Sequence, residues 1–547
     1  MTHATDRRQF LARLGSAGAL LAGSSWLPGF GYAQSRGPAR AVIDQRHYRG
    51  DLDRRVLGAF LEHLGRAVYE GVYDPGNPLS DSRGFRRDVM DEIRQMGVPI
   101  IRYPGGNFVS GYNWQDGVGP KDQRPTVLER AWNSLEPNQF GTNEFIDWCR
   151  AVGTEPLLGF NMGTASTADA IAYVEYCNYA RGTKWSDLRR SHGYEEPHNV
   201  RYWCLGNEMD GPWQMGTMPA REYGRKARDI AQQIRVIDRS LQLIACGSSA
   251  PSMDTYLVWD REVLEECFDM VDGISLHCYY GNTEELSGND TARYLAMNLD
   301  MERQILEIGA VCDYVQGLYK SQKRLWLSFD EWNVWYRARS GEHTNGRGQF
   351  APHLLEEQYN LEDALLVGGF INTLLRQSER TRVACLAQIV NVIAPLMTSP
   401  TGLLRQATYY PYLWSLKYAR GRVLDPGLSG ETYEIRAGNL REDYARDDLV
   451  PYVDVAITHD RERNEAAVFL LNRDLEGERE IVLDWEDPTP TRVLAAETLT
   501  GPDLKAINTF DAPNRVRPET FDTPRPGRSM TFRLPKASYT IVHLATA

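Results

Sequence analysis

The sequence lacks the basic clusters that nucleic-acid-binding proteins use. Its 547 residues contain 61 Lys and Arg against 73 Asp and Glu, which gives a formal net charge of −12. A chain of this charge without a Lys/Arg-rich run repels a phosphate backbone. We therefore expect no nucleic-acid partner.

Metal-ligand and disulfide motifs are also missing. The ten histidines form no HxH or HExxH motif, so no metal site is predicted. The eight cysteines are scattered from Cys149 to Cys385 without a CxxC pair. Several of them, such as Cys204 and Cys278, lie inside predicted strands. We interpret them as buried free thiols, because free cysteine packs as a small hydrophobic residue.

Long apolar runs are scarce as well. The segment Leu14–Leu27 is too short to span a bilayer comfortably. It follows Arg7-Arg8 and precedes a small-x-small site at residues 31–33, a pattern that resembles a twin-arginine export signal over residues 1–33. We expect a periplasmic or secreted protein with no membrane attachment after signal removal. An amphipathic N-terminal helix is the less favoured alternative, because the segment has no polar face.

The middle of the chain predicts a closed parallel barrel. Short apolar runs alternate with helix-like stretches such as Thr142–Val152 and Pro219–Ile237, which predicts a (β/α)8 TIM barrel over residues 51–412. A doubly wound open sheet would show the same alternation. Polar residues at the ends of the runs favour closure, because all strand ends of a barrel converge on one face. The runs are Val56–Leu61, Val98–Tyr103, Pro156–Asn161, Val200–Leu205, Leu241–Cys246, Gly273–His277, Leu325–Phe329 and Val383–Ile389.

The pattern changes from about Leu413 onward. Alternating strands such as Ala466–Leu471, Glu480–Trp485 and Met530–Leu534 are separated by turns rich in Pro, Gly and Asp. Residues 413–547 are therefore predicted to form an all-β sandwich resembling a jelly roll. We favour a packing role for this domain over carbohydrate binding, because topology alone does not indicate function.

Two glutamates stand where buried strands open into loops. Glu208 lies in the run RYWCLGNEMDGPWQ and Glu331 in the run LWLSFDEWNVWY. Hydrolysis of a glycosidic bond needs one carboxylic acid to protonate the leaving oxygen and a second carboxylate to attack or to activate water. Such a pair needs no cofactor. The residues alone leave open which glutamate plays which part.

The order of several motifs identifies a family. The runs FLEHLGRAVYEGVYDP, IRYPGGNFVSGYNWQDGVGP, WCLGNEMDGPWQ, LHCYYGN, FDEWNVWY and AQIVNVIAP resemble the signature blocks of glycoside hydrolase family 51. The typical member is a retaining α-L-arabinofuranosidase that acts on terminal non-reducing residues of arabinose-containing oligo- or polysaccharides. The resemblance also implies that residues 34–50 join the C-terminal sandwich. A homo-oligomer, commonly a hexamer, is the state that the family suggests.

Carried over residue by residue, the resemblance assigns the site. It implies that Glu208 is the general acid/base and Glu331 the nucleophile. Asn207 would hydrogen-bond the sugar 2-hydroxyl, and His277 would lie between Arg102 and Tyr279 on the same face. The remaining matches hold furanose hydroxyls (Glu62, Asn107 and Gln388), lie near the nucleophile (Arg102 and Tyr279) or wall the pocket (Trp132 and Trp335).

Each assignment has an alternative. Asp330 could be the working carboxylate, although neighbours on a strand point to opposite faces and only one can face the pocket. Arg102 and Glu62 could form a structural ion pair, His277 could be a hydrogen-bonded core residue, and Trp132 could be interior packing. Alternative functions are a β-xylosidase or endoglucanase of the same family, or a non-catalytic exported sugar-binding protein.

Overall fold

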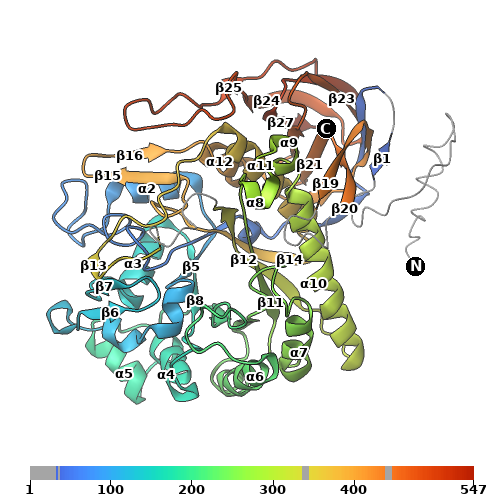
Figure 1. Ribbon diagram of the computed structural model, residues 1–547. Coiled ribbons are helices and arrows are strands. Elements are labelled where there is room, and N and C mark those ends of the chain that lie inside the picture. Colours follow the sequence, from blue (N-terminus) through green and yellow to red (C-terminus); the bar gives the residue numbers. More distant parts are fainter. Residues whose placement is uncertain (1–31, 35–36, 336–343, 438–445) are drawn as a thin grey trace.

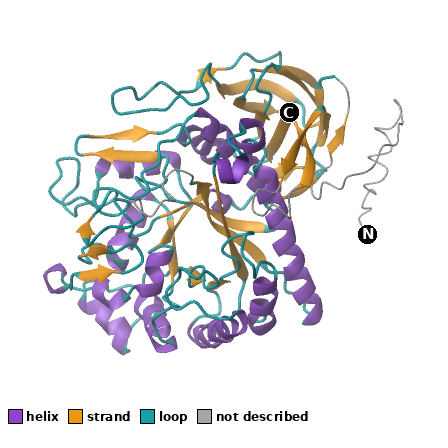
Figure 2. Cartoon of the chain, viewed as in Figure 1, coloured by secondary structure: helices purple, strands orange, loops and turns teal. Residues whose placement is uncertain are grey.

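Eight parallel strands close into a barrel in the part of the chain that the structure describes. The computed structural model describes residues 32–34, 37–335, 344–437 and 446–547. The closed strand order confirms the predicted (β/α)8 TIM barrel and excludes the open sheet (Figures 1 and 2). In order around the barrel, the strands are β4 (Gly58–Phe60), β5 (Ile100–Tyr103), β8 (Glu155–Gly159), β9 (Tyr202–Leu205), β10 (Gln242–Ala245), β11 (Gly273–Tyr280), β12 (Trp326–Val334) and β14 (Thr381–Leu386).

Helices cover the outside of the barrel, as Figure 2 shows around the central strands. The two stretches predicted to be helical form α3 (Thr142–Val152) and α6 (Ala220–Ile237). α3 ends where Gly153 takes a left-handed φ of 78°, a conformation that favours glycine. The other helices are α2 (Arg87–Met96), α4 (Thr167–Asn178), α5 (Lys184–Ser191), α7 (Val258–Cys267), α8 (Glu284–Ser287), α9 (Thr291–Tyr294), α10 (Asn298–Leu318), α11 (Leu361–Arg376) and α12 (Tyr409–Tyr418), with 3-10 turns η1 (Arg54–Leu57), η2 (Asn107–Gly111), η3 (Trp114–Gly117) and η4 (Lys121–Gln123).

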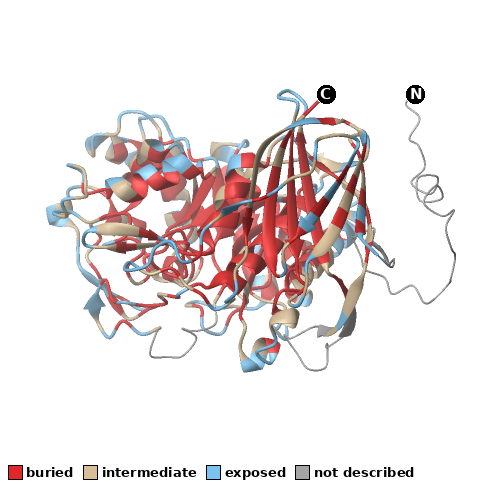
Figure 3. Ribbon diagram, turned by 90° about the horizontal axis from the view of Figure 1, so that it is seen from above, coloured by how far each residue is buried: buried red, intermediate tan, exposed pale blue. Residues whose placement is uncertain are grey.

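The barrel strands are apolar because both of their faces are covered. Helices pack on the outer face and side chains from neighbouring strands fill the inner one. Every residue of β5 and β9 is buried, and Figure 3 shows buried segments running through the barrel. Arg102 in β5 is a charged residue inside this apolar layer. A buried guanidinium needs partners, and those of Arg102 are Glu331, Asp330 and Asn207.

A β-sandwich packs beside the barrel, which confirms the predicted C-terminal β-domain (Figure 1). Its core includes Trp485, Phe532 and Leu544, which are buried. Strands β2 and β3 precede the barrel in the chain but belong to the two sheets of this domain. One sheet has the order β1 (Tyr32–Gln34), β18 (Gly427–Gly430), β2 (Ala39–Asp44), β23 (Arg479–Asp487) and β26 (Ser529–Leu534). The other has the order β25 (Glu519–Thr520), β24 (Pro490–Leu499), β27 (Ser538–Thr546), β22 (Glu465–Asn472), β21 (Val453–Asp460), β17 (Arg422–Leu424) and β3 (Tyr48–Asp51).

Smaller sheets decorate the two domains. The hairpins β15 (Leu396–Ser399) with β16 (Gly402–Arg405) and β19 (Thr432–Ala437) with β20 (Arg446–Pro451) are antiparallel pairs. A three-stranded sheet is formed by β13 (Gln349–Phe350), β7 (Ser134–Glu136) and β6 (Val127–Glu129). The β6–β7 hairpin lies between barrel strands β5 and β8 in the chain, so it follows the carboxyl end of β5. It therefore belongs to the face of the barrel where active sites form.

A buried ion network joins the sandwich to the barrel. Asp454 of β21 accepts hydrogen bonds from Arg376 Nη1 and Arg473 Nη2, both at 2.7 Å, and from Asn372 Nδ2 at 2.9 Å. Burial alone would raise the pKa of Asp454, but the two guanidinium groups outweigh it and lower this pKa. Arg376 and Asn372 belong to α11, all of whose residues are buried. The network therefore links α11, a buried helix between strands β12 and β14 in the chain, to the second domain.

No helix in the described part of the chain is long and apolar enough to cross a bilayer. All eight cysteines are free and buried, which confirms their interpretation as packed thiols. The predicted signal, residues 1–33, lies outside the described residues except for positions 32 and 33, which begin β1 beside β18.

Removal of the Asp454 charge should destabilise the protein. Asp454→Asn leaves two buried guanidinium groups short of a counter-ion, at a cost of about 3 kcal/mol or more. A carboxyl whose pKa is lowered by folding stabilises above its unfolded pKa, and this contribution is lost as the pH falls through the folded pKa. The difference from wild type in urea unfolding should thus be full at neutral pH and shrink in strong acid. Asp511→Asn, an exposed site, is the control. Equal midpoints for the two variants would contradict this role.

Candidate active site

The predicted site residues gather at the carboxyl ends of the barrel strands. A pocket of about 720 Å³ opens there, and Glu208 and Glu331 both line it. Asn207 and Glu208 follow β9, whereas Glu331 lies within β12. Of the other predicted residues, the pocket is lined by Glu62, Asn107, Trp132, Tyr279, Trp335 and Gln388. Arg102, Asn207 and His277 lie in a buried layer in contact with these groups.

Glu331 is held by one cation and one phenol. Arg102 Nη1 donates to Glu331 Oε1 at 2.6 Å, and the Tyr279 hydroxyl donates to Oε2 at 2.7 Å. The Glu331 side chain is only 6% exposed. Both contacts donate hydrogen bonds to the carboxylate and hold it in one orientation. This setting suits a nucleophile.

Glu208 is more open to solvent, at 11% side-chain exposure, and its contacts differ. Trp213 Nε1 donates to Glu208 Oε2 at 2.7 Å, and His277 Nδ1 lies 2.9 Å from Oε1. The backbone at Glu208 has a positive φ of 43°, which is uncommon for a residue with a side chain. Backbone strain of this kind gathers at functional sites, where surrounding contacts hold it.

His277 is a buried cation between the carboxyl groups. Burial lowers its pKa, but Glu331, Asp330 and Glu208 together outweigh this and raise it to about 10. At neutral pH the imidazole is therefore protonated and donates from both nitrogens, Nδ1 to Glu208 and Nε2 to Asp330 at 3.0 Å. His277 is thus a buried, hydrogen-bonded residue, and its partners are the carboxyl groups of Glu208 and Asp330.

Asp330 lies beneath the pocket rather than in it. Its carboxylate is fully buried and contacts His277 Nε2, Cys204 Sγ at 3.2 Å and Arg102 Nε at 3.5 Å. Burial raises its pKa, but Arg102 and His277 outweigh this and lower it. Asp330 therefore holds in place the two cations that contact the pocket glutamates. From the sequence, Asp330 was considered only as an alternative to Glu331 for the working carboxylate.

Glu62 forms the opposite wall and is not paired with Arg102. Its Oε1 accepts from the Phe108 N–H and from Trp132 Nε1, both at 2.9 Å, and its backbone N–H donates to Gln388 Oε1 at 2.8 Å. Burial, followed by the charge of Glu331, raises the pKa of Glu62 to about 8. It is thus mostly protonated at neutral pH. A neutral carboxyl can donate to a ligand hydroxyl as well as accept from one.

Local sequence explains how these groups approach one another. Gly105 has a φ of 129°, and a Cβ there would lie 2.2 Å from Glu62 Cγ. At Gly106 a Cβ would meet Glu62 Oε2 at 3.0 Å and Glu331 Oε1 at 3.1 Å. The Pro-Gly-Gly turn after β5 therefore leaves the space in which the carboxyl groups sit. Larger residues would displace Glu62.

Aromatic side chains complete the walls. Trp132 projects from the β6–β7 hairpin, where Glu129 accepts its backbone N–H at 2.8 Å. Trp335 lies edge-on to Tyr279, with ring centroids 5.1 Å apart. Trp213, which the sequence reasoning missed, is 51% exposed at the rim. The sequence feature that could have indicated Trp213 is its position five residues after Glu208 in the same run. A large aromatic side chain there can pack against a sugar face.

The same cluster also has metal-like spacing. Ligand atoms of Glu208, His277 and Glu331 lie within 4.8 Å of one another. A metal needs the lone pair of a neutral imidazole, whereas both nitrogens of His277 are occupied by hydrogen bonds to carboxylates. Glu208, His277 and Glu331 are therefore better suited to proton transfer than to binding a metal ion.

Closely spaced acids at the mouth of a parallel barrel suit a glycoside hydrolase, and comparison with known proteins shows the family. Models described as "Alpha-L-arabinofuranosidase 1 domain" and "Alpha-L-arabinofuranosidase C-terminal domain" match residues 92–297 and 330–538. The chain belongs to the family 51 α-L-arabinofuranosidases, as its sequence blocks predicted. An "Intracellular exo-alpha-(1->5)-L-arabinofuranosidase" of Halalkalibacterium halodurans is 45% identical over 471 residues, which cover 86% of this chain and 92% of the relative.

Further relatives agree with this assignment. The "Intracellular exo-alpha-(1->5)-L-arabinofuranosidase 1" of Bacillus subtilis is also 45% identical, over 86% of this chain and 91% of its own length. Among solved structures, a family 51 α-L-arabinofuranosidase from Bifidobacterium longum superposes with a TM-score of 0.87 at 36% identity. That match covers 93% of this chain and all of the other.

The relatives correct the predicted location. Four similar arabinofuranosidases are named intracellular, which contradicts the expectation of a periplasmic or secreted protein. The expectation depended on an Arg-Arg pair and one short apolar segment. A short motif of this kind does not itself show that an export machinery recognises it.

The charge of Asp330 should set the upper pH limit of activity. His277 has a raised pKa, so it stays protonated until the pH passes that value. Asp330→Asn removes one supporting charge and should move the basic limb of kcat/KM on an aryl α-L-arabinofuranoside to lower pH. We also expect kcat/KM at the optimum to fall roughly tenfold to a hundredfold. Cys204→Ala, which removes a contact to Asp330 but no charge, is the matched control. An unshifted basic limb in Asp330→Asn would contradict this positioning role.

Proposed function

We propose that this protein is a retaining exo-acting hydrolase that releases terminal non-reducing α-L-arabinofuranosyl residues. The observation that carries the proposal is the spacing of the carboxyl groups, since one oxygen of Glu208 and one of Glu331 lie within 4.8 Å. Retaining glycosidases hold their carboxyl groups roughly 5–5.5 Å apart, whereas inverting ones leave about 6.5–9.5 Å for a water. The short spacing supports direct attack by a carboxylate.

In the first step Glu331 acts as nucleophile and Glu208 as acid. A Glu331 oxygen attacks the anomeric carbon, the bond to the leaving oxygen breaks, and Glu208 transfers its proton to that oxygen. In the second step Glu208 takes a proton from water. The water oxygen attacks the anomeric carbon and the ester bond to Glu331 breaks, which restores both carboxyl groups.

The charge of the cluster supports these roles. With Glu208 protonated, the negative charges of Glu331 and Asp330 balance the positive charges of Arg102 and His277. After the first step Glu331 is a neutral ester and Glu208 has lost its proton, so the sum is again zero. A buried cluster that stays neutral in both states avoids the cost of desolvating a net charge.

The proposed sugar contacts come from the pocket walls. We expect Glu62, Asn107 and Gln388 to bind furanose hydroxyls and Trp132 and Trp335 to flank the ring, because all five line the pocket. Asn207 Oδ1 accepts from Arg102 Nη2 at 2.6 Å and its Nδ2 donates to Asn107 Oδ1 at 3.5 Å, so the second amide N–H is the proposed donor to the 2-hydroxyl. Relatives named for α-(1→5) and α-(1→6) activity lead us to propose arabinose-containing oligo- or polysaccharides, of the kind released from hemicellulose, as substrates. We also retain a homo-oligomer as a proposal.

Single substitutions of the two glutamates should have different effects. Glu331→Ala should lower kcat at least about 1,000-fold on every arabinofuranoside, because no covalent intermediate can form. Glu208→Ala should lose far more on an oligosaccharide than on a nitrophenyl arabinofuranoside, because nitrophenolate leaves without a proton. Initial rates on both substrates measure this, with the exposed Glu222→Gln as control. Near-normal turnover by Glu331→Ala would rule out the mechanism.

Azide should report the stereochemistry. Added to Glu208→Ala, azide can replace water in the second step and give an arabinofuranosyl azide with the substrate's anomeric configuration. Added to Glu331→Ala, azide can attack from the vacated side and give the opposite anomer. Proton NMR of the products distinguishes the two. The reverse pairing of anomers and variants would exchange the proposed roles, and inversion by wild-type enzyme would refute retention.

A further inference from the structure

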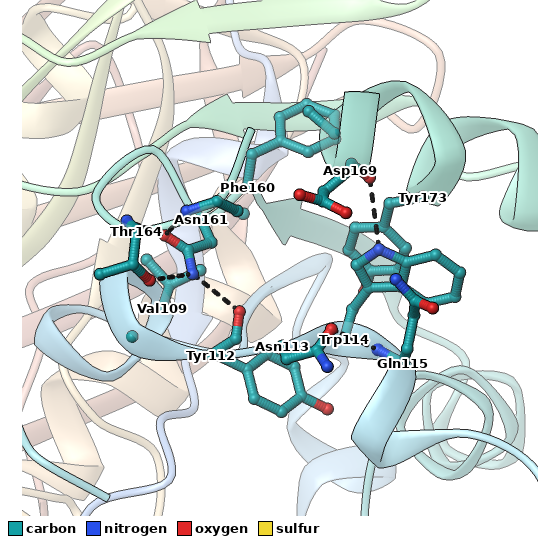
Figure 4. Close-up of a pocket in the computed structure, with 14 residues that line it drawn as sticks. Val109, Tyr112, Asn113, Trp114, Gln115, Phe160, Asn161, Thr164, Asp169 and Tyr173 are labelled. Carbon is teal, nitrogen blue, oxygen red and sulfur yellow. Dashed lines mark hydrogen bonds between the residues drawn. The ribbon is translucent and has the colours of Figure 1, made fainter. Parts of the chain in front are cut away.

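A second cavity lies on the catalytic face, outside the pocket that holds the glutamates. Its volume is about 300 Å³, at the small end of the range for ligand sites. One wall is the segment Val109–Gln115, which follows β5, and the other is formed by the loop after β8 and the first turns of α4 (Figure 4). Because both loops follow carboxyl ends of barrel strands, the cavity opens on the same face as the active site.

The two cavities share structural elements. The 3-10 turn η2 contributes Asn107 to the active-site pocket and Val109 and Gly111 to the second cavity. The loop after Glu208 also borders both. Its Trp213 lines the active-site pocket, and its Met215 packs so close to Gly111 that a Cβ there would lie 2.5 Å from Met215 Cε. The two cavities therefore adjoin the same two segments, η2 and the loop after Glu208.

The lining indicates a neutral, hydroxyl-rich ligand. None of the described residues that line the cavity is Lys, Arg or His, so it offers no cation for a phosphate or carboxylate. Its polar groups are amides, hydroxyls and one carboxylate, set among Phe160, Trp114 and Tyr173. Amide and carboxylate groups beside aromatic rings are suited to the hydroxyls and apolar faces of a sugar.

Asp169 supplies the strongest acceptor. Its side chain points into the space between Asn161 and Trp114 (Figure 4). Both of its hydrogen bonds with Ser166, from the N–H at 3.0 Å and the hydroxyl at 2.6 Å, use Oδ2. Oδ1 is therefore available to accept from a ligand hydroxyl, and a charged acceptor makes a stronger hydrogen bond than a neutral one.

The cavity is built on a fixed framework. Asn161 Nδ2 donates to the Tyr112 carbonyl at 2.9 Å and to Thr164 Oγ1 at 2.9 Å, which ties the two walls together. Trp114 stacks on Tyr173, with centroids 5.1 Å apart and planes 11° from parallel, and its Nε1 donates to the Asp169 carbonyl at 3.3 Å. These contacts hold the walls without a ligand, so binding would cost little ordering entropy.

We propose that this cavity binds an internal pentosyl unit of the same substrate chain whose terminal residue occupies the active site. The inference rests on the proposed function and extends it from the terminal sugar to the rest of the chain. The enzyme would gain affinity for longer oligosaccharides without any change in the reacting centre. A disaccharide or an aryl glycoside would not reach the second cavity.

Blocking the cavity tests this proposal. Ala165→Trp fills the space, and Gln115→Ala removes a polar group from its wall. With linear α-1,5-linked arabino-oligosaccharides of increasing length, wild-type kcat/KM should rise with length and Ala165→Trp should abolish the rise. We expect roughly a tenfold loss on the long chains, mainly through KM, and less than about a twofold change on an aryl arabinofuranoside. Gln115→Ala should show a smaller loss of the same kind.

Matched controls place the same changes outside the cavity. Ala168→Trp on the exposed side of α4 and Gln123→Ala on η4 should both keep the wild-type dependence on length. Unchanged aryl activity in Ala165→Trp also shows that the variant is folded. The proposal is refuted if wild-type kcat/KM does not depend on length, or if Ala165→Trp leaves that dependence intact. A wild-type enzyme without activity on the aryl arabinofuranoside would instead refute the proposed function.

Discussion

Two buried cations between three carboxylates are the interaction on which the catalytic centre depends. Carboxylate oxygens of Glu208 and Glu331 within 4.8 Å of each other would repel by about 3 kcal/mol at an effective dielectric of about 20 if both were ionised. Arg102 and His277 offset this repulsion, and Asp330 keeps both cations in position from below. Because Arg102, His277, Asp330 and Glu331 are all buried, removal of one of them leaves another unpaired in a poorly solvated site.

The barrel makes this network possible, because its closed strands bring distant segments to one layer. Arg102, His277 and Asp330 come from β5, β11 and β12. The loops then add what the strands cannot supply, namely the tryptophans at the rim and the Pro-Gly-Gly turn that leaves room for Glu62. The rigid layer thus fixes the reacting groups, while the loops on the same face shape the surroundings of the substrate.

The degree to which the sequence predicted this arrangement differs from one element to the next. Apolar runs bounded by polar residues were enough to predict the barrel strands, because burial on both faces leaves a continuous apolar pattern. The bounds of α3 were predicted residue for residue, and the helix ends at a glycine. The role of Asp330 was not predictable, since strand alternation says that Asp330 and Glu331 point apart but not what lies on either side. Export was predicted wrongly, because it was inferred from a short motif without any structural context.

The sequence by itself determined the fold class, the family and the order of motifs that carry Glu208 and Glu331, since these follow from local periodicity and from residues adjacent in the chain. Only the tertiary structure decided which groups touch. It decided that Arg102 pairs with Glu331 rather than Glu62, that His277 is doubly hydrogen-bonded to carboxylates, and that a second cavity opens beside the active site. The physical reason is that charge pairing and cavity shape depend on distances of a few ångströms between segments far apart in sequence, which no local pattern encodes.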